Sequence, residues 1–265
     1  MPTRNPVKQK LRDGKCVFGQ MIMEFYTPGI AQILASGGAD FIIYDMEHGR
    51  CDMSLAAGLF ASCKGTGVEP FVRVPDLASY PLSRVLDLGA RGVMVPRVET
   101  GEQAREIMAQ MKYAPQGRRG VALGIAHDNF RPGGPEFFSQ ANEDTVVIAL
   151  VETSRGLENL DEIVSTPGLD IAWMGHYDLT VSMGIPAQFQ HPKFLKAMDR
   201  FLASCQRNLV AAGFLPANPQ DALHWIAKGF RAISLGADVY LYSQAFRNFY
   251  DSVVTGLASE QAAGK

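Results

Sequence analysis

The segment Val146-Val147-Ile148-Ala149-Leu150-Val151-Glu152 contains six apolar residues in a row and ends on an acid. A continuous apolar run, in place of strict alternation, is typical of a parallel strand that is covered on both faces. Similar short runs recur along the whole chain. The other seven are Val17–Met23, Phe41–Asp45, Phe71–Val74, Val93–Val95, Ile171–Met174, Ala212–Leu215 and Ala232–Leu235.

Helical segments lie between these runs. Within Gly101–Met111, apolar residues recur at i, i+3, i+4 and i+7, which predicts a helix with one apolar stripe. Asn218, Pro219 and Asp221 have the order of an N-cap, a first-position proline and an acid in the first turn. Eight alternations of strand and helix predict an α/β fold of the (β/α)8 TIM barrel type, a single domain over residues 1–265 with its core at about 14–250. A doubly wound sheet is the alternative, but no G-x-G-x-x-G follows the first run.

The composition is that of an ordinary globular protein. Of 265 residues, 47% are hydrophobic and 20% are charged, and 25 Lys and Arg stand against 27 Asp and Glu for a formal net charge of −2. This balance argues against nucleic-acid and membrane partners and favours a small-molecule partner. The basic start of the chain is followed by no apolar run of the kind found in a signal peptide or a membrane span.

The four cysteines, Cys16, Cys51, Cys63 and Cys205, are scattered along the chain. Their spacing fits neither a disulfide framework nor a zinc finger, because no C-x-x-C occurs. We expect reduced cysteines and a cytoplasmic protein.

The interval between Val95 and Val146 is longer than a barrel requires. It holds one predicted helix and then about 30 residues rich in Gly and Pro. A lid over the substrate and a loop that contacts another subunit are equally good interpretations.

Ionisable residues follow several of the predicted strands, and barrel enzymes carry their chemistry at that end. Glu152 and Asp178 follow two successive strands, which lie about 4.8 Å apart in a parallel sheet. Two such carboxylates, together with water and a chelating substrate, are a common way to hold Mg²⁺ or Mn²⁺. His48 could be a third ligand or, with better support, a base that titrates near neutral pH.

Each of these residues also has a purely structural interpretation. Asp45 could cap the next helix, and Asp178 could be the N-cap of a short helix. Arg73 and Arg97 could pair with carboxylates across the mouth of the barrel. Taken together, however, the groups converge on one edge, as titratable groups do in a functional site.

The lysines argue against one kind of chemistry. None of the nine lies within or just after a predicted strand. An aldolase that works through a Schiff base needs a desolvated lysine aimed into the barrel. Metal catalysis is therefore favoured.

Several stretches of the chain are similar to the HpcH/HpaI family of class II (metal-dependent) 2-keto-acid aldolases, over roughly residues 14–250. Their order and spacing carry the resemblance. They are Asp45-x-Glu47-His48, Val72-Arg73-Val74-Pro75, Leu86-Asp87-x-Gly89-Ala90, Val93-x-Val95-Pro96, Tyr113-x-Pro115-x-Gly117-x-Arg119-Gly120, Val151-Glu152-Thr153, Gly175-x-x-Asp178-Leu179 and His191-Pro192.

The resemblance implies an aldolase that cleaves or forms 4-hydroxy-2-oxo acids through a pyruvate- or hydroxypyruvate-type enolate. It implies that Glu152 and Asp178 bind a divalent ion, Mg²⁺, Mn²⁺ or Co²⁺, which the 2-keto acid chelates. Arg73 would stabilise the enolate oxygen. His48 would move the proton of the 4-hydroxyl through a metal-bound water, and Asp87 of a neighbouring subunit would orient it.

The resemblance also implies the substrate contacts. Backbone amides of the loop Gly175-His176-Tyr177-Asp178 would hold the substrate carboxylate, and Leu215 would line the pocket.

The resemblance further implies a homohexamer, built as a trimer of dimers, with a C-terminal helix packed on or exchanged with a partner. Gln244–Leu257 carries an apolar stripe that could form this helix, although the stripe could equally pack in the chain's own core.

The chain departs from the family pattern at four places. Leu150 stands where many members have Gln, and His176-Tyr177 replaces the usual Pro-Ala/Ser of the loop. The first strand has no aromatic ring among Gln20–Ile22. His127 adds a histidine to the long interval. Each of His127 and His176 alone is more often a structural histidine, but two additions near one mouth favour a role as an acid, a base or a substrate contact.

Two other functions stay open. One is a related metal-enolate lyase or decarboxylase, for example on an acyl-CoA ester, for which Arg118, Arg119 and Arg131 offer only a modest basic groove. The other is a barrel without catalytic activity that binds a ligand or a partner.

Overall fold

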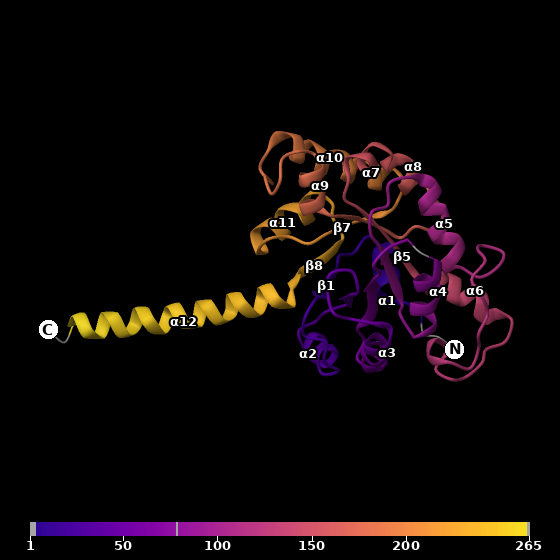
Figure 1. Cartoon of the computed structure of the whole chain (residues 1–265), viewed down its shortest axis with the longest axis horizontal. Helices are drawn as coiled ribbons and strands as arrows, with labels where there is room; N and C mark the ends of the chain where they lie inside the picture. The colour runs from indigo at the N-terminus through magenta and orange to yellow at the C-terminus, as the bar shows by residue number, and fades with distance from the viewer. Residues whose placement is uncertain (1–3, 78, 264–265) are drawn as a thin grey trace.

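The computed structural model describes residues 4–77 and 79–263, with the backbone alone for residues 79–81 and 260–263. Eight parallel strands close into a barrel in the order of the sequence, so the predicted (β/α)8 fold is confirmed (Figure 1). The strands are β1 (Val17–Ile22), β2 (Phe41–Asp45), β3 (Glu69–Arg73), β4 (Gly92–Val95), β5 (Val146–Val151), β6 (Ile171–Met174), β7 (Ala211–Phe214) and β8 (Ala232–Ala237).

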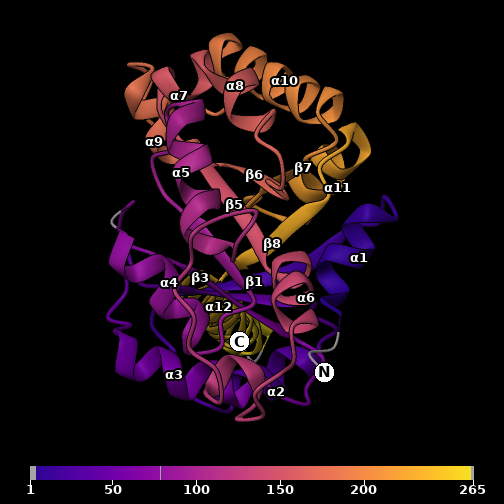
Figure 2. The same ribbon diagram turned by 90° about the vertical axis from the view of Figure 1, so that its right-hand side faces the viewer.

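The described residues also form the helices given next, most of which cover the outer face of the barrel (Figure 2). They are α1 (Pro6–Arg12), α2 (Ile30–Ser36), α3 (Met53–Ser62), α4 (Ser79–Asp87), α5 (Gly101–Met111), the 3₁₀ turn η1 (Ala126–Asp128), α6 (Glu136–Asp144), α7 (Ser154–Glu158), α8 (Leu160–Val164), α9 (His176–Ser182), α10 (Pro192–Arg207), α11 (Pro219–Lys228) and α12 (Asp238–Ala263). The α5 bounds match the prediction, and the side chain of Asn218 caps α11 by accepting from the backbone N–H of Asp221. None of these helices, within the described residues, is both long and apolar enough to cross a bilayer.

Large and small residues alternate inside the barrel. The rings of Phe41 and Phe71 stack with their centroids 5.3 Å apart, and the indole of Trp173 meets Phe41 edge-on at 6.5 Å. Glycines on the neighbouring strands make room for these rings. A Cβ on Gly213 would lie 2.3 Å from the Trp173 ring, which is far inside van der Waals contact. The interior is therefore a packed core, and the chemistry is confined to the rim.

The amino end of the barrel is closed by α1. Val7 of this helix is fully buried in the interior cluster. The Nζ of Lys8 lies 2.9 Å from an Asp170 carboxylate oxygen and donates to the carbonyl of Thr145 at 3.2 Å. The carboxyl ends of the strands thus form the open rim.

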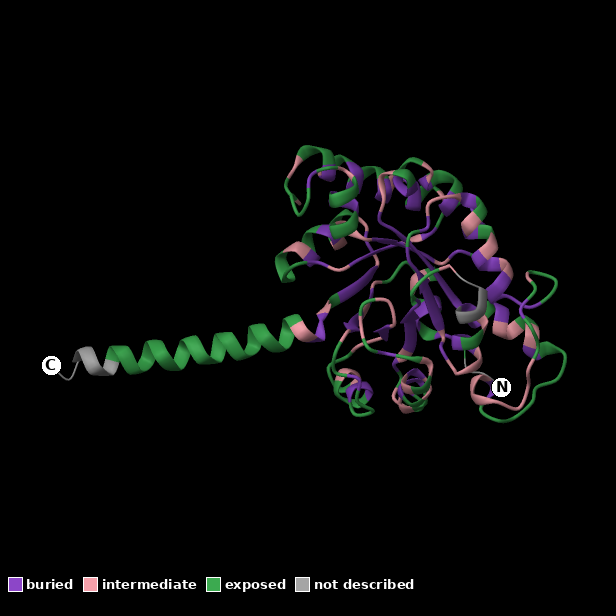
Figure 3. Cartoon of the chain, in the orientation of Figure 1, coloured by how far each residue is buried: buried purple, intermediate pink, exposed green. Residues whose placement is uncertain are grey.

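Helix α12 leaves the barrel directly after β8 and projects away from it (Figure 1). Its residues 240–259 are exposed (Figure 3), with Phe246 66% and Phe249 76% accessible. The interpretation that this stripe packs in the chain's own core is therefore wrong. The helix extends beyond the predicted Gln244–Leu257 in both directions.

The packing inside the barrel generates a first prediction. Gly213→Ala forces a methyl group against Trp173 and should destabilise the protein by about 1–3 kcal/mol. Gly58→Ala is the matched control, because Gly58 lies within α3 and a Cβ there meets nothing within 4 Å. This variant should stabilise the protein by up to about 1 kcal/mol. Urea unfolding measures both. Equal midpoints for the two variants would contradict this packing.

Candidate active site

Arg73 and Asp45 form a buried ion pair at the rim. These residues end β3 and β2, which are neighbours in the barrel with Asp45 opposite Arg73. The Nε of Arg73 donates to Oδ1 of Asp45 at 2.8 Å and the Nη2 donates to Oδ2 at 2.6 Å. The carboxylate raises the pKa of Arg73 even though burial opposes its charge. The guanidinium is thus a fixed positive charge at the rim.

The structural interpretation of Arg73 as an ion-pair partner is confirmed, whereas that of Asp45 as a helix cap is wrong. Helix α3 is capped by Asp52, whose side chain accepts from the backbone N–H of Leu55. Asp45 instead accepts from the backbone N–H of Glu47 at 3.0 Å, in addition to its pairing with Arg73. It therefore holds both the arginine and the loop that follows β2.

Glu47 is a rim residue to which the sequence reasoning gave no role. Its Oε2 lies 3.2 Å from Nη1 of Arg73 and 3.7 Å from Nε2 of His48. Burial raises the pKa of Glu47, and this Oε2 accepts no hydrogen bond. The signal that could have identified it is its place two residues after a strand end and directly before His48.

Glu152 follows β5 and is 4% exposed. Its Oε1 accepts the backbone N–H of Arg97 at 2.8 Å. A Cβ on Gly175 would lie 2.7 Å from its Oε2, so the glycine lets this carboxylate lie against the loop after β6. Burial, reinforced by the negative charges of Glu47 and Asp178, raises the pKa of Glu152 to about 7.

The expected ion pair of Arg97 is replaced by a backbone contact. Arg97 exposes its side chain and offers only its N–H to Glu152. Its φ of 52° lies in the left-handed region, which costs a residue with a Cβ about 1–2 kcal/mol. The backbone is therefore strained where it meets the buried carboxylate.

Asp178 lies in the first turn of α9, whose N-cap is Gly175, so the prediction of Asp178 as the N-cap is wrong. Its carboxylate acts on both Glu152 and Glu47 through space. Within the described part of the chain, no three His, Cys, Asp or Glu side chains gather in a metal-binding cluster. Glu152 and Asp178, which interact electrostatically, are the candidate ligands, and a hard ion held by two carboxylates keeps water and substrate as its other ligands. The raised pKa of Glu152 fits this role, because a cation would relieve the charge that burial opposes.

His48 is 55% exposed at the rim, and its nearest charged neighbour is Glu47. Its interpretation as a third metal ligand finds no support in this arrangement. An exposed imidazole beside a carboxylate suits proton transfer.

Apolar and aromatic side chains surround these charges. Leu150 is buried in the barrel interior with Trp173, and Leu215 packs partly buried against the same cluster. His176 lies among the rings of Tyr177, Phe189 and Phe214, at centroid distances of 4.7, 5.1 and 5.0 Å. Burial lowers the pKa of His176 to about 4, so it is a neutral packing residue near pH 7.

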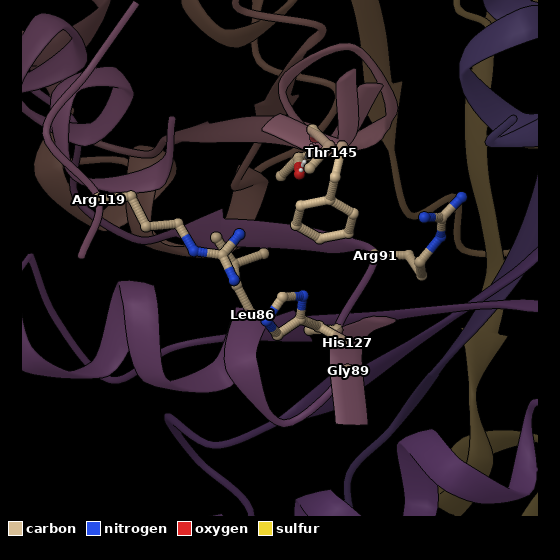
Figure 4. Close-up of a pocket in the computed structure, with 9 residues that line it drawn as sticks. Leu86, Gly89, Arg91, Arg119, His127 and Thr145 are labelled. Atoms are coloured by element: carbon tan, nitrogen blue, oxygen red, sulfur yellow. Dashed lines mark hydrogen bonds between the residues drawn. The ribbon is translucent and has the colours of Figure 1, made fainter. Parts of the chain in front are cut away.

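Asp87 and His127 lie at the other end of their own barrel. Asp87 ends α4, which runs back from the rim, and its Oδ1 accepts from Nη2 of Arg119 at 2.6 Å. The ring of His127 lies tilted against that of Phe137, with the centroids 5.4 Å apart, and lines a cavity of about 30 Å³ with Arg119, Arg91 and Thr145 (Figure 4). Arg91 and Thr145, which line this cavity with His127, directly precede β4 and β5, so His127 lies at the amino end of its own barrel. The expectation that His127 lies near the mouth together with His176 is therefore wrong within one chain. After α5, the long interval that carries it contains η1 and α6 joined by loops.

The buried lysines also lie at the amino end. The Nζ of Lys112 donates to the carbonyls of Asn142 and Thr145 at 2.5 and 2.9 Å, and burial lowers its pKa to about 7. Such an amine would suit a Schiff base by its pKa alone. Its place on the far side of the packed core from Glu152 argues against that role.

A barrel whose strand ends gather ionisable side chains at one rim is the arrangement of a TIM-barrel enzyme. A family model described as HpcH/HpaI aldolase/citrate lyase matches residues 23–245. The chain belongs to this family, and with it to the carbon–carbon lyases.

Individual proteins agree with this placement. The chain is 30% identical over 241 residues to a 2-keto-3-deoxy-L-rhamnonate aldolase of Salmonella gallinarum, covering 91% of this chain and 90% of that protein. It is similar to the crystal structure of an HpcH/HpaI aldolase from Desulfitobacterium hafniense DCB-2, with a TM-score of 0.89 and 30% identity over 93% of this chain and 95% of that one. A structure of the citrate synthase SbnG has a TM-score of 0.82 and 28% identity, covering 97% of this chain and 98% of that one.

The raised pKa of Glu152 generates a second prediction, for the metal-free protein. Between pH 4.5 and about 7 the folded state holds a proton on Glu152 that the unfolded chain has released, so stability falls as pH rises through this window. Glu152→Gln removes that titration. Its free energy of unfolding, measured with urea, should exceed that of the wild type by about 2–3 kcal/mol at pH 8. The difference at pH 4.5 should be small. Glu158→Gln, at an exposed site, is the control; a gain for Glu152→Gln that is equal at both pH values would contradict the burial argument.

Proposed function

We propose that this protein is a metal-dependent aldolase that cleaves or forms 4-hydroxy-2-oxo acids through a pyruvate- or hydroxypyruvate-type enolate. The observation that carries the proposal is the pairing of a buried carboxylate, Glu152, with the carboxylate of Asp178 beside the fixed charge of Arg73. Family membership supports the class of reaction, and the names of the relatives support an aldolase.

Glu152 and Asp178 would hold the divalent ion, Mg²⁺, Mn²⁺ or Co²⁺. The bound ion would supply Lewis acidity toward the keto oxygen and the carboxylate of the substrate. Arg73 would place its positive charge where negative charge develops on that oxygen, and its fork to Asp45 means that it need not reorganise as the charge forms.

The loop after β6 would bind the substrate carboxylate. The first backbone N–H groups of α9, at His176, Tyr177 and Asp178, have no acceptor within the helix and favour an anion. The neutral His176 and the half-exposed Tyr177 would shape the pocket by packing, and Leu215 would line it.

His48 would exchange the proton of the 4-hydroxyl as the carbon–carbon bond breaks or forms. Its orienting partner would be Asp87 of another copy of the chain, since Asp87 of the same chain lies at the far end of the barrel. The same contact would bring His127 of that copy toward the aldehyde portion of the substrate.

A homohexamer built as a trimer of dimers fits these needs. The exposed aromatic stripe of α12 would be covered by a partner in such an assembly. A cytoplasmic location also stays a prediction, supported by four free cysteines.

A lyase acting on an acyl-CoA ester is less well supported. Arg118 pairs with Glu106 and Arg119 pairs with Asp87, so neither presents an unpaired charge to a nucleotide. Binding of a CoA thioester, measured by calorimetry, would favour this alternative.

The metal requirement generates a third prediction. The purified protein should release pyruvate or a related 2-oxo acid from 4-hydroxy-2-oxo acids with Mg²⁺, Mn²⁺ or Co²⁺, and EDTA should abolish this release. Glu152→Ala should lose both metal retention and activity, whereas Glu158→Ala should keep both. Undiminished turnover in EDTA, or full metal occupancy of Glu152→Ala, would refute the ligand assignment.

The division of His48 and Asp87 between two subunits generates a fourth prediction. His48→Ala and Asp87→Ala should each lower kcat by about 100-fold or more, because each removes part of one proton-transfer unit. Mixed and reassembled, the two variants should regain activity, since some sites then combine an intact His48 with an intact Asp87. A mixture no more active than its components, after mass spectrometry has confirmed mixed oligomers, would overturn the shared site.

A further inference from the structure

Tyr26 lies between β1 and α2 and is 6% exposed. Its hydroxyl donates to the backbone carbonyl of Asp45 at 2.8 Å. Asp45 is the residue that holds Arg73 and the amide of Glu47. We propose that Tyr26 is a positioning residue for the lyase reaction, which fixes the loop after β2 and through it the guanidinium of Arg73; this inference rests on the proposed function.

The hydroxyl of Tyr26 is inserted into the loop that it positions. A Cβ on Gly49 would lie 1.7 Å from this oxygen, 2.7 Å from the carbonyl oxygen of Asp45 and 2.9 Å from that of Met23. Only glycine fits at a point where two loops and a tyrosine meet so closely. Gly49 directly follows His48, so the contact spans the stretch that carries Asp45, Glu47 and His48.

The loop that carries Tyr26 is itself held from the far end of the chain. Asp238, the first residue of α12, is 4% exposed. Its carboxylate accepts from the backbone N–H groups of Met23, Glu24 and Phe25 at 2.9, 3.0 and 2.6 Å. An anion held by several backbone amides is a strong and directional contact. A continuous set of contacts therefore runs from Asp238 through the Tyr26 loop to Asp45 and Arg73.

The site has two halves, and Tyr26 contacts only one of them. Glu152 and Asp178 follow β5 and β6 and have no contact with Tyr26 in the described hydrogen bonds. Loss of the Tyr26 hydroxyl should therefore misplace Arg73 and leave metal affinity unchanged. Burial raises the pKa of Tyr26 well above its usual range, so the phenol remains a donor at every working pH.

Tyr26→Phe in the full-length, metal-loaded protein tests the inference. Misplacement by a fraction of an ångström should lower kcat about 10- to 100-fold. The dissociation constant for Mn²⁺, read by electron paramagnetic resonance, should stay within about twofold of wild type, because the carboxylates are not moved. A merely structural defect would lower kcat and the melting temperature and would also raise the dissociation constant for Mn²⁺.

Tyr44→Phe is the matched control. Tyr44 precedes Asp45 on the same strand, is fully buried, and directs its hydroxyl to Sγ of Cys63 at 3.5 Å, away from the rim. This variant also loses one buried tyrosine hydroxyl, next to Asp45 in the sequence, and should keep wild-type kcat. Equal losses of kcat in the two variants, or a kcat of Tyr26→Phe within twofold of wild type, would overturn the inference.

Asp238→Asn supplies an independent variant. It should lower kcat in the same direction, and the double variant with Tyr26→Phe should lose less than the product of the two single losses, since both act on one set of contacts. Multiplicative losses would show that the two residues act separately and would contradict the linkage. A wild-type protein without turnover on any 2-oxo acid would overturn both this inference and the proposed function, whereas an active wild type with an unaffected Tyr26→Phe overturns this inference alone.

Discussion

The buried ion pair between Arg73 and Asp45 is the interaction on which the rim depends. Asp45 is fully buried, so its negative charge is tolerable only because the guanidinium of Arg73 pairs with it through two hydrogen bonds. The same carboxylate takes the amide of Glu47, and its backbone carbonyl takes the hydroxyl of Tyr26. Removal of Arg73 would leave the Asp45 carboxylate buried without a countercharge, and removal of Asp45 would leave Arg73 with Glu47 alone. Either change would loosen the loop that carries His48.

The rim as a whole has more negative charge than positive charge. Asp45, Glu47 and Glu152 act on one buried arginine, and Asp178 acts on Glu47 and Glu152. Burial, reinforced by the neighbouring carboxylates, raises the pKa of both Glu47 and Glu152. A divalent cation and an anionic 2-oxo acid together would restore the balance. The formal net charge of −2 for the whole chain hides this local asymmetry, because cations elsewhere cancel it.

The sequence was a good guide to whatever depends on backbone periodicity and topology. The apolar runs predicted β2, β5 and β6 with their observed bounds, and parallel topology then required Arg73, Glu152 and Asp178 to share one rim. Contacts between loops were beyond its reach. Nothing in the spacing indicates that Tyr26 touches Asp45, because the contact depends on the absence of a side chain at Gly49. His127 was misplaced because a long interval can fold back to either end of a barrel, and the stripe of α12 has the same pattern for a core or for a partner.

The central claim is that the carboxylates of the rim hold a metal ion that promotes formation of an enolate. Enolisation of pyruvate tests it most directly, because this step takes place without the aldehyde. Pyruvate is incubated in D₂O with the protein and Mg²⁺, and its methyl proton signal is followed by nuclear magnetic resonance. The account predicts loss of this signal faster than in buffer, and no such loss with EDTA or with Glu152→Ala. Exchange that survives EDTA and the substitution, or no exchange with Mg²⁺, Mn²⁺ or Co²⁺, would contradict it.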